Sequence, residues 1–476
     1  MFDSLHEECG VFGIYSHKTN DVALQAYFAL YALQHRGQES CGIVVNDDGV
    51  MSQYKDIGLV PDVFTKQNLE KLGEGNMAMG HVRYSTTGMK SRSNAQPLVV
   101  RHVKGPMALA HNGNLTNAAE LREALEMEGA IFHTTNDTEV ISYVVTKARL
   151  ESGSIQEALE KAMYQIKGAY SLIIMSATKL IAARDPNGFR PLCIGITPDD
   201  DIIFASETCA LDSLDAKLIR EVEPGEIVIV NQDGLHSIRT HCGGKSNFCV
   251  FEFIYFARPD SVISGASVHN ARKRAGRFLA QEHPVEADVV IGVPDSGLDA
   301  AMGYSQESGI PYGVGFIKNR YIGRTFIQPT QTERERSVKI KLNVISETVK
   351  GKRVVMIDDS IVRGTTSRRI VNLLREAGAA EVHMRTAAPP FLHPCYFGTD
   401  IDSREKLIAH RLGVEQVAKH IGADSLGFLS VKNVHKIAEN AACGFCDGCF
   451  SGHYPVEPPQ ARAKNKFENK LGQRRA

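Results

Sequence analysis

One cysteine close to the start of the chain could act as a nucleophile. Cys9 follows two glutamates and precedes Gly-Val-Phe-Gly-Ile. If residues 1–8 were cut away, a free α-amine would lie beside the thiol. Its pKa of about 7.7–8.0 would let it act as a base near neutral pH without a histidine. Taken alone, Cys9 could equally be a small buried residue that opens a strand.

Polar segments further along could complete a site around this thiol. They are 35–40, 80–86, 111–114 and 135–139. An amino-acid amide needs a cation for its carboxylate, an anion for its ammonium and donors for the oxyanion of the tetrahedral intermediate. Arg83 and Asp137 can supply the two charges, and Asn112 with the Gly113 backbone N–H can supply the donors. In isolation, Asn112-Gly113 would be a tight hairpin turn and Arg83 a surface charge.

Together these segments resemble the glutaminase domain of the N-terminal nucleophile amidotransferases, from Cys9 to about Leu211. The similarity includes Arg-Asp-Pro-Asn-Gly at 184–188 and Ser-Glu-Thr at 206–208. It implies a stacked αββα fold and removal of residues 1–8 as a propeptide. It also implies that Cys9 attacks the amide of glutamine, forms a thioester and releases ammonia. Asn112 and Gly113 would then be catalytic, and Arg83 and Asp137 would bind glutamine.

A second chemical motif occupies residues 354–366. A hydrophobic strand leads into Asp358-Asp359-Ser360, then into Arg363-Gly364-Thr365-Thr366, and a helix is predicted to follow. Adjacent carboxylates can hold the vicinal hydroxyls of ribose, and N–H groups and hydroxyls at a helix N-terminus suit a phosphate. Paired aspartates alone could equally form a charged turn at the end of a strand.

The complete motif resembles the signature of the type I phosphoribosyltransferases. That resemblance implies that Asp358 and Asp359 hold the ribose 2′ and 3′ oxygens, and that 363–367 surround the 5′-phosphate. It places a pyrophosphate loop at 293–297 and implies Mg²⁺, bound mainly by substrate oxygens with Ser296, Asp358 and Asp359. The basic loop 318–325 would close as a lid and exclude water from the reacting carbon, although such a loop alone would be solvated surface. The implied phosphosugar-binding residues are Asp295, Ser296, Lys318, Tyr321, Arg324, Asp358, Asp359, Ser360, Arg363, Gly364, Thr365, Thr366 and Ser367.

The two resemblances in one chain imply one reaction, the glutamine-dependent amination of phosphoribosyl pyrophosphate in purine synthesis. Ammonia would pass internally between the sites. Feedback inhibition by purine nucleotides and a homotetramer are implied by the family alone. An asparagine or glucosamine-phosphate synthase is the alternative enzyme, but neither would need Asp358 and Asp359. A regulator that only senses the phosphosugar is the alternative outside catalysis, and it would need neither Cys9 nor Arg83.

Three cysteines, Cys443, Cys446 and Cys449, have the two-residue spacing typical of a metal site. Cys249 and Cys395 could supply distant ligands. Four thiolates suit either an iron–sulfur cluster or tetrahedral zinc. Resemblance to cluster-bearing members of the family implies a structural [4Fe–4S] cluster on Cys249, Cys395, Cys446 and Cys449, with Cys443 as an extra thiol.

More than one domain must position these residues, because a chain of 476 residues is longer than a domain with a single hydrophobic core. Short alternating strands at 170–175, 179–183, 192–196, 202–205 and 226–230 predict antiparallel sheets, whereas the continuous apolar strands 288–293 and 354–357 predict a parallel α/β sheet. We therefore expect a propeptide at 1–8, a glutaminase domain at 9–240, a phosphoribosyltransferase domain at 248–450 that turns helical near Ser403, and a tail at 451–476.

The composition points to a globular protein of the cytoplasm. The chain is 43% hydrophobic and 23% charged, with a formal net charge of −1. This balance gives no electrostatic reason to expect nucleic acid or a membrane as a partner. The acidic start does not resemble a secretory signal, and no apolar run approaches the length of a membrane helix.

Overall fold

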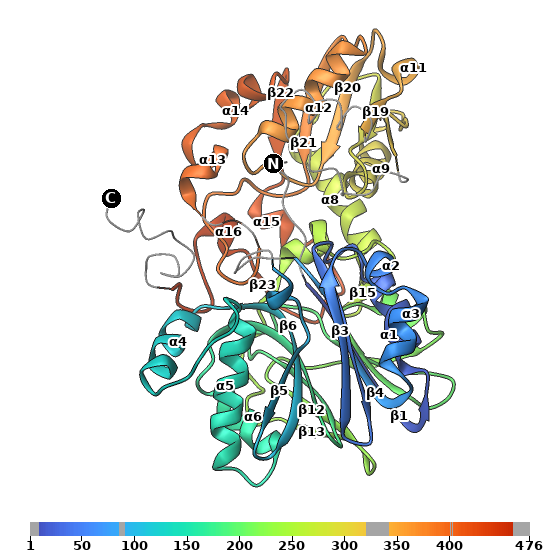
Figure 1. Cartoon of the computed structure of the whole chain (residues 1–476). Coiled ribbons are helices and arrows are strands. Elements are labelled where there is room, and N and C mark those ends of the chain that lie inside the picture. The colour runs from blue at the N-terminus through green and yellow to red at the C-terminus, as the bar shows by residue number, and fades with distance from the viewer. Residues whose placement is uncertain (1–8, 85–90, 320–341, 400, 402, 460–476) are drawn as a thin grey trace, which may run out of the picture.

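The computed structural model describes residues 9–84, 91–319, 342–399, 401 and 403–459. The predicted propeptide, the lid residues Tyr321 and Arg324, and most of the predicted tail lie outside these residues. The chain forms two domains, one blue to green and one yellow to red in Figure 1. Within the described part of the chain, no helix combines the length and apolarity needed to cross a bilayer.

The first domain is built on two facing antiparallel sheets. The seven-stranded sheet has the order β11-β9-β10-β1-β4-β2-β3 and the six-stranded sheet has the order β13-β12-β8-β7-β6-β5. The first comprises β1 (Gly10–Asn20), β2 (Ser40–Asp47), β3 (Val50–Ile57), β4 (Gly75–Arg83), β9 (Cys193–Ile196), β10 (Ile202–Ala205) and β11 (Lys217–Glu221). The second comprises β5 (Leu98–His102), β6 (Gly105–Leu115), β7 (Gly168–Ser176), β8 (Leu180–Arg184), β12 (Ile227–Asn231) and β13 (Gly234–Ile238).

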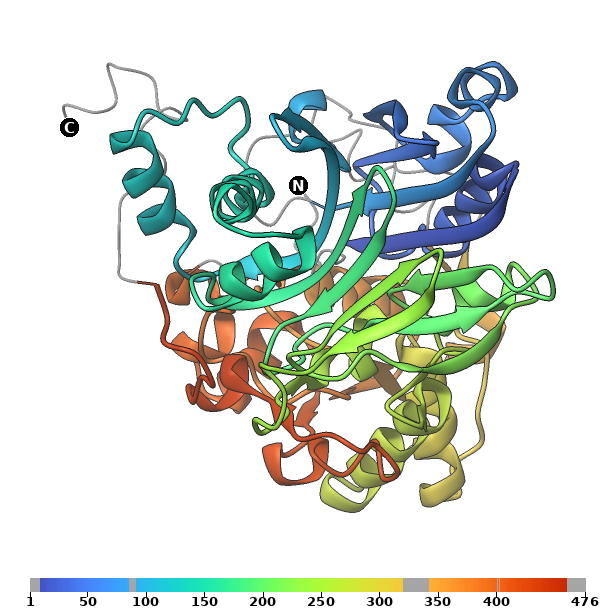
Figure 2. The same ribbon diagram turned by 90° about the horizontal axis from the view of Figure 1, so that it is seen from below.

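Apolar residues on the facing sides of the two sheets form the central core, which includes Val11, Met79, Ala110 and Ile173. The helices α1 (Val22–Ala32) and α7 (Thr208–Asp212) pack on the outer face of the seven-stranded sheet. The helices α5 (Asp137–Leu150) and α6 (Ile155–Met163) pack on the outer face of the other, as Figure 2 shows from below. The predicted αββα sandwich is therefore confirmed.

The second domain contains a parallel sheet of order β17-β20-β21-β22. Its strands are β17 (Val289–Gly292), β20 (Arg353–Asp358), β21 (Glu381–Thr386) and β22 (Ser425–Phe428). In β20, Val355 and Ile357 face α8 (Val268–Glu282) and α9 (Gly297–Ser308). Val354 and Met356 face α12 (Thr365–Glu376) and α14 (Val414–Ile421) on the other side. Burial on both faces explains the continuous apolar strands, and the predicted parallel α/β sheet is confirmed.

The part of the chain after Ser403 is less helical than predicted. It contains the short helices α13 (Ile408–Arg411), α15 (Val431–Val434) and α16 (Gly448–Ser451) besides α14. It also contributes β22 to the parallel sheet and β23 (Phe445–Cys446), which pairs with β14 (Phe248–Cys249). β22 has the sequence Ser-Leu-Gly-Phe, which is not a continuous apolar run, and β23 has only two residues, so neither strand shows a recognisable pattern.

Candidate active sites

Cys9 lies at the edge of the first domain where β1 begins. Gly10 pairs with Val82 of β4, so Cys9 lies beside the end of that strand. The thiol donates to the carbonyl oxygen of Tyr84 at 3.3 Å. Arg36 Nε donates to the carbonyl oxygen of Cys9 at 2.9 Å. The next residue, Gly37, packs so closely on β4 that a Cβ atom would lie 2.6 Å from the nitrogen of Arg83, which explains the glycine after Arg36.

The predicted oxyanion donors lie on β6 of the facing sheet. His81 of β4 reaches across and donates from Nε2 to the carbonyl oxygen of His111 at 3.0 Å, which fixes β6 against β4. Asn112 is fully buried, yet among the described residues neither its Oδ1 nor its Nδ2 atom has a hydrogen-bond partner. Burying an unpaired amide costs free energy. The Asn112 amide group therefore keeps its capacity to form hydrogen bonds.

Asp137 and Arg83 both lie buried near these donors. Asp137 Oδ2 accepts from the Leu115 N–H at 3.0 Å, and its Oδ1 lies 3.5 Å from His111 Nδ1. Burial favours the neutral acid, but His111, the Leu115 N–H and Arg83 together lower the pKa of Asp137 below its ordinary value. The Arg83 guanidinium lies 3.9 Å from the carboxylate of Glu39. The predicted cation, Arg83, thus lies beside a second carboxylate, Glu39, and the predicted anion, Asp137, lies beside His111.

His81 is not a candidate base, because burial lowers its pKa to about 3. Its imidazole is therefore neutral near pH 7 and serves to join the two sheets. Sequence reasoning missed this role. It also missed Arg36, whose guanidinium is buried with Glu207 of the first domain and Glu252 of the second. The segment around Arg36 is conspicuous in the sequence, but its carboxylate partners lie far away in the chain.

The second site lies at the carboxyl edge of the parallel sheet. Asp358 ends β20, and the Val293 N–H donates to the Ile357 carbonyl at 2.8 Å, which brings the loop after β17 to the same edge. Ser296 of that loop donates to Asp359 Oδ2 at 2.5 Å. Asp295 forms an ion pair with Lys318 at the end of β18 (Phe316–Lys318). The structure therefore brings the predicted ribose and pyrophosphate residues together.

The two adjacent carboxylates at this edge differ in exposure: Asp358 is buried and Asp359 is half-buried. Burial and the charge of Asp359 raise the pKa of Asp358 well above its ordinary value. Burial also raises the pKa of Asp359, against the lowering effect of its bonds to Ser296 and Ser360. Two adjacent acids whose pKa values are both raised are stabilised by a bound cation. The donor set therefore fits a divalent ion held together with substrate oxygens.

The predicted phosphate loop precedes α12. Gly364 has φ +82° at the helix N-cap, a left-handed conformation that favours glycine. Thr365 and Thr366 form the first turn, whereas Ser367 is buried. The N–H groups at this helix start face no acidic residue in the first turn, which suits a phosphate.

Of the five cysteines considered as metal ligands, four lie near one another and the fifth, Cys443, lies apart. Cys249 on β14 lies opposite Cys446 on the neighbouring strand β23. Burial raises the pKa of the Cys449 thiol, and the nearby thiols of Cys395, Cys249 and Cys446 raise it further. The four thiols therefore lie close together. Cys443 instead lies beside Ser264, near Arg184 and Glu221.

The segment after Cys395 packs against the first domain. The Tyr396 carbonyl accepts from Asn114 Nδ2 at 3.0 Å, and the Phe397 ring stacks on Phe189 with centroids 4.2 Å apart. Both partners belong to the first domain, and Asn114 is two residues from Asn112. The four-thiol group therefore lies at the junction of the domains.

Two family models match the chain. A glutamine amidotransferase domain matches residues 81–213, and a phosphoribosyl transferase domain matches residues 265–390. The amidophosphoribosyltransferase of Bacillus subtilis is 50% identical over 460 residues, which cover 95% of each chain. That of Archaeoglobus fulgidus is 49% identical and covers 95% of this chain and 98% of its own.

Solved structures agree with these matches. Glutamine phosphoribosylpyrophosphate amidotransferase from B. subtilis, complexed with ADP and GMP, superposes with a TM-score of 0.88 at 48% identity. The match covers 96% of this chain and 99% of that one. Since both domains and nearly the whole length are shared, the chain belongs to the amidophosphoribosyltransferase family.

Proposed function

We propose that the chain transfers the amide nitrogen of glutamine to C1 of phosphoribosyl pyrophosphate, which yields phosphoribosylamine, pyrophosphate and glutamate. This reaction is the first committed step of purine synthesis. The observation that carries the proposal is the presence of two complementary sites in one chain. In one, Cys9 lies beside the end of β4, which His81 links to β6 next to the unpaired buried amide of Asn112. In the other, Asp358 and Asp359 precede a helix start that suits a phosphate.

In the first half-reaction, the Cys9 sulfur attacks the amide carbon of glutamine. The α-amine exposed by removal of residues 1–8 takes the thiol proton. Asn112 Nδ2 and the Gly113 N–H donate to the oxyanion. The carbon–nitrogen bond then breaks, the amine returns the proton to the leaving ammonia, and water hydrolyses the thioester to glutamate. Arg83 and Asp137 bind the carboxylate and ammonium of glutamine.

In the second half-reaction, ammonia attacks C1 and pyrophosphate leaves with the electrons of the C1–O bond. Asp358 and Asp359 hold the ribose hydroxyls, and Ser360, Arg363, Thr365 and Thr366 hold the 5′-phosphate around Gly364. Asp295, Ser296 and Lys318 would bind pyrophosphate, and Tyr321 and Arg324 would complete a lid. Mg²⁺ held by Ser296, Asp358 and Asp359 would neutralise the charge that develops on pyrophosphate.

Ammonia is expected to pass internally between the sites, because in neutral water it would mostly become ammonium and lose its nucleophilic lone pair. Purine nucleotides are proposed as inhibitors, since the related B. subtilis enzyme is complexed with ADP and GMP in its solved structure. A homotetramer is proposed from the family, and sedimentation velocity would test it.

The function is tested by glutamate release from glutamine. Anaerobically purified protein whose mass begins at Cys9 is assayed with and without phosphoribosyl pyrophosphate and Mg²⁺. Release that rises with the phosphosugar and is matched by pyrophosphate supports the transferase. No release in either condition would instead favour a regulator that only senses the phosphosugar.

Replacing Asn112 by leucine tests the oxyanion assignment. We expect kcat with glutamine to fall by roughly 10²- to 10³-fold, the usual cost of one oxyanion donor. Because the Asn112 amide is buried without a partner among the described residues, the thermal midpoint should not fall. Steady-state kinetics and calorimetry check both expectations. A destabilised variant with unchanged kcat would assign Asn112 to the core.

We further propose that Cys249, Cys395, Cys446 and Cys449 bind a [4Fe–4S] cluster, since their thiols gather at the domain junction. Replacing Cys446 by serine should lower the iron content from about four atoms per chain to below one and remove the visible absorption. Replacing Cys443, the outlier, should change neither. Metal and sulfide analysis decides the matter, and zinc without sulfide in the unmodified protein would contradict the cluster.

A further inference from the structure

Four fully buried charged side chains meet where the two domains join, and we name them the interdomain charge cluster. They are Arg36, Arg190, Glu207 and Glu252, each with a fully buried side chain. Arg36 lies 2.7 Å from Glu207 and 2.8 Å from Glu252. Arg190 lies 3.1 Å from Glu252. Glu252 therefore joins two arginines that no single strand or helix brings together.

The charges of the cluster balance only when both domains contribute. Arg36, Arg190 and Glu207 belong to the first domain, whereas Glu252 belongs to the second. Glu252 thus neutralises a buried positive charge that the first domain would otherwise retain. In return, Glu207 accepts from the Ser261 hydroxyl at 2.7 Å and from the Arg258 N–H at 2.9 Å, both from the second domain.

The cluster does not resemble a metal site, although His35, Glu207 and Cys209 lie close together. Glu207 Oε1 already accepts from His35 and Arg36, and its Oε2 accepts from Ser261 and Arg258. Both carboxylate oxygens are thus already engaged by donors of the protein. Glu207 therefore has no oxygen without a hydrogen-bond partner to offer a metal ion.

One end of the cluster touches the nucleophile. The same Arg36 guanidinium that binds Glu252 through both terminal nitrogens donates from Nε to the carbonyl oxygen of Cys9. This bond fixes the backbone of the residue whose thiol and α-amine must both meet the substrate. Displacing a reacting group by about 1 Å can cost on the order of 10²-fold in rate.

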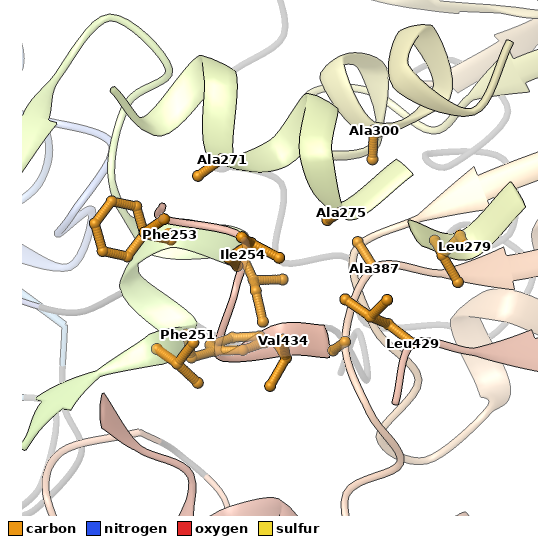
Figure 3. Close-up of a cluster of buried hydrophobic side chains, with 14 of the residues drawn as sticks. Phe251, Phe253, Ile254, Ala271, Ala275, Leu279, Ala300, Ala387, Leu429 and Val434 are labelled. Carbon is orange, nitrogen blue, oxygen red and sulfur yellow. The ribbon is translucent and has the colours of Figure 1, made fainter. Parts of the chain in front are cut away.

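The other end reaches the phosphosugar site. Glu252 begins η2 (Glu252–Phe256), a π-helical turn. Arg272 of α8 donates to the carbonyl oxygens of Phe253, Tyr255 and Ala257, which holds this turn against α8. Figure 3 shows Phe253 and Ile254 of the turn beside Ala271 and Ala275 of α8. The positive charge of Arg272 in turn acts on Asp359.

These contacts form a continuous route from Cys9 through Arg36 and Glu252 to η2 and then to Arg272 of α8. A buried ion pair is a weak source of stability, because the desolvation of its charges offsets their attraction. A buried ion pair does fix the relative positions of its two side chains, because separating them would leave an unpaired buried charge. This supports a role in alignment over one in stability.

On the basis of the proposed function, we propose that Glu252 is a positioning residue: through Arg36 it makes the orientation of Cys9 depend on the docked second domain. The glutamine half-reaction then proceeds efficiently only while η2 holds its position, which lets the second domain control the first.

The test replaces Glu252 by glutamine, which keeps the shape and removes the charge. We expect glutamate release from glutamine to fall by roughly 10- to 100-fold, and the ratio of glutamine-dependent to ammonia-dependent product formation to fall by about tenfold or more. The rate at which a diazoketone analogue of glutamine labels Cys9, measured by mass spectrometry, should fall in parallel. That labelling reports on the nucleophile independently of turnover.

Two further variants make the result decisive. Glu226→Gln is the matched control, because the buried Glu226 carboxylate pairs with Arg220 at 2.7 Å wholly within the first domain. It should leave the activity ratio unchanged. The double variant Glu252→Gln with Arg190→Gln restores the buried charge balance. The double variant should keep the low ratio of glutamine-dependent to ammonia-dependent product formation. If Glu252→Gln alone does not fold, the double variant is used in its place.

The proposal is overturned if Glu252→Gln lowers both activities equally, or if Cys9 is labelled at the unmodified rate. Either result would give the cluster a structural role only. Failure of the proposed function is distinct, because the unmodified protein would then release no glutamate.

Discussion

Replacing Cys9 by alanine is expected to lower glutamine-dependent product formation by roughly 10⁴-fold or more, since no other group can form the thioester. Turnover with added ammonia should persist, because ammonia enters after the glutamine chemistry and the second site is unchanged. Pyrophosphate release with each nitrogen donor measures both activities in one preparation.

The matched control is Cys242→Ser. Cys242 is a half-buried thiol in the segment between the domains, near Glu223, Glu226, Arg220 and Arg239. None of these belongs to either candidate site, so its replacement should leave both activities intact. If the Cys9 variant retained glutamine turnover, the nucleophile assignment would be wrong. If it also lost ammonia turnover while remaining folded, the two sites would not be chemically separable.

Replacing Asp358 by asparagine is expected to abolish product formation from both nitrogen donors while it stabilises the ligand-free protein. Activity should fall by at least about 10²-fold, because the ribose hydroxyls and the metal lose a charged partner. The thermal midpoint should rise, because a buried acid next to Asp359 is replaced by a neutral amide of the same shape. The gain near pH 7 is on the order of 1 kcal/mol.

The pH dependence of folding stability follows from the raised pKa of Asp358. Folding raises the pKa of Asp358 above its unfolded value of about 3.9, so the folded state binds the proton more tightly. The resulting stability is fully present below the unfolded pKa and is lost as pH rises through the raised folded pKa. Calorimetry across this range should show the loss in the unmodified protein and a smaller loss in the variant.

Asp288→Asn provides the control within the same sheet. Asp288 precedes β17 at the opposite edge, where it pairs with Arg353 at 3.0 Å in an exposed position. Its replacement should leave activity with both donors unchanged. A stabilised Asp288 variant, or an Asp358 variant that is active or destabilised, would contradict the assignment of the buried carboxylates to the substrate site.

The sequence by itself determined the two kinds of sheet and the segments that carry the chemistry. Continuous apolar strands such as Val354–Ile357 indicated a sheet covered on both faces, and the aspartates that follow necessarily lie at its carboxyl edge. Such information resides in neighbouring residues, whose spacing reflects strand and helix periods. The strand β22 escaped prediction because its sequence, Ser-Leu-Gly-Phe, is not a continuous apolar run like those of β17 and β20.

Only the tertiary structure decided which distant side chains meet. Arg36 and Glu252 are 216 residues apart, and nothing local to either distinguishes a buried partner from a solvated charge. The same holds for Cys395, which joins Cys446 and Cys449, whereas Cys443, much nearer in sequence, lies apart. The unpaired amide of Asn112 is likewise a property of its surroundings. Hydrogen bonding and burial depend on how separate elements pack, and the residue types alone do not contain that packing.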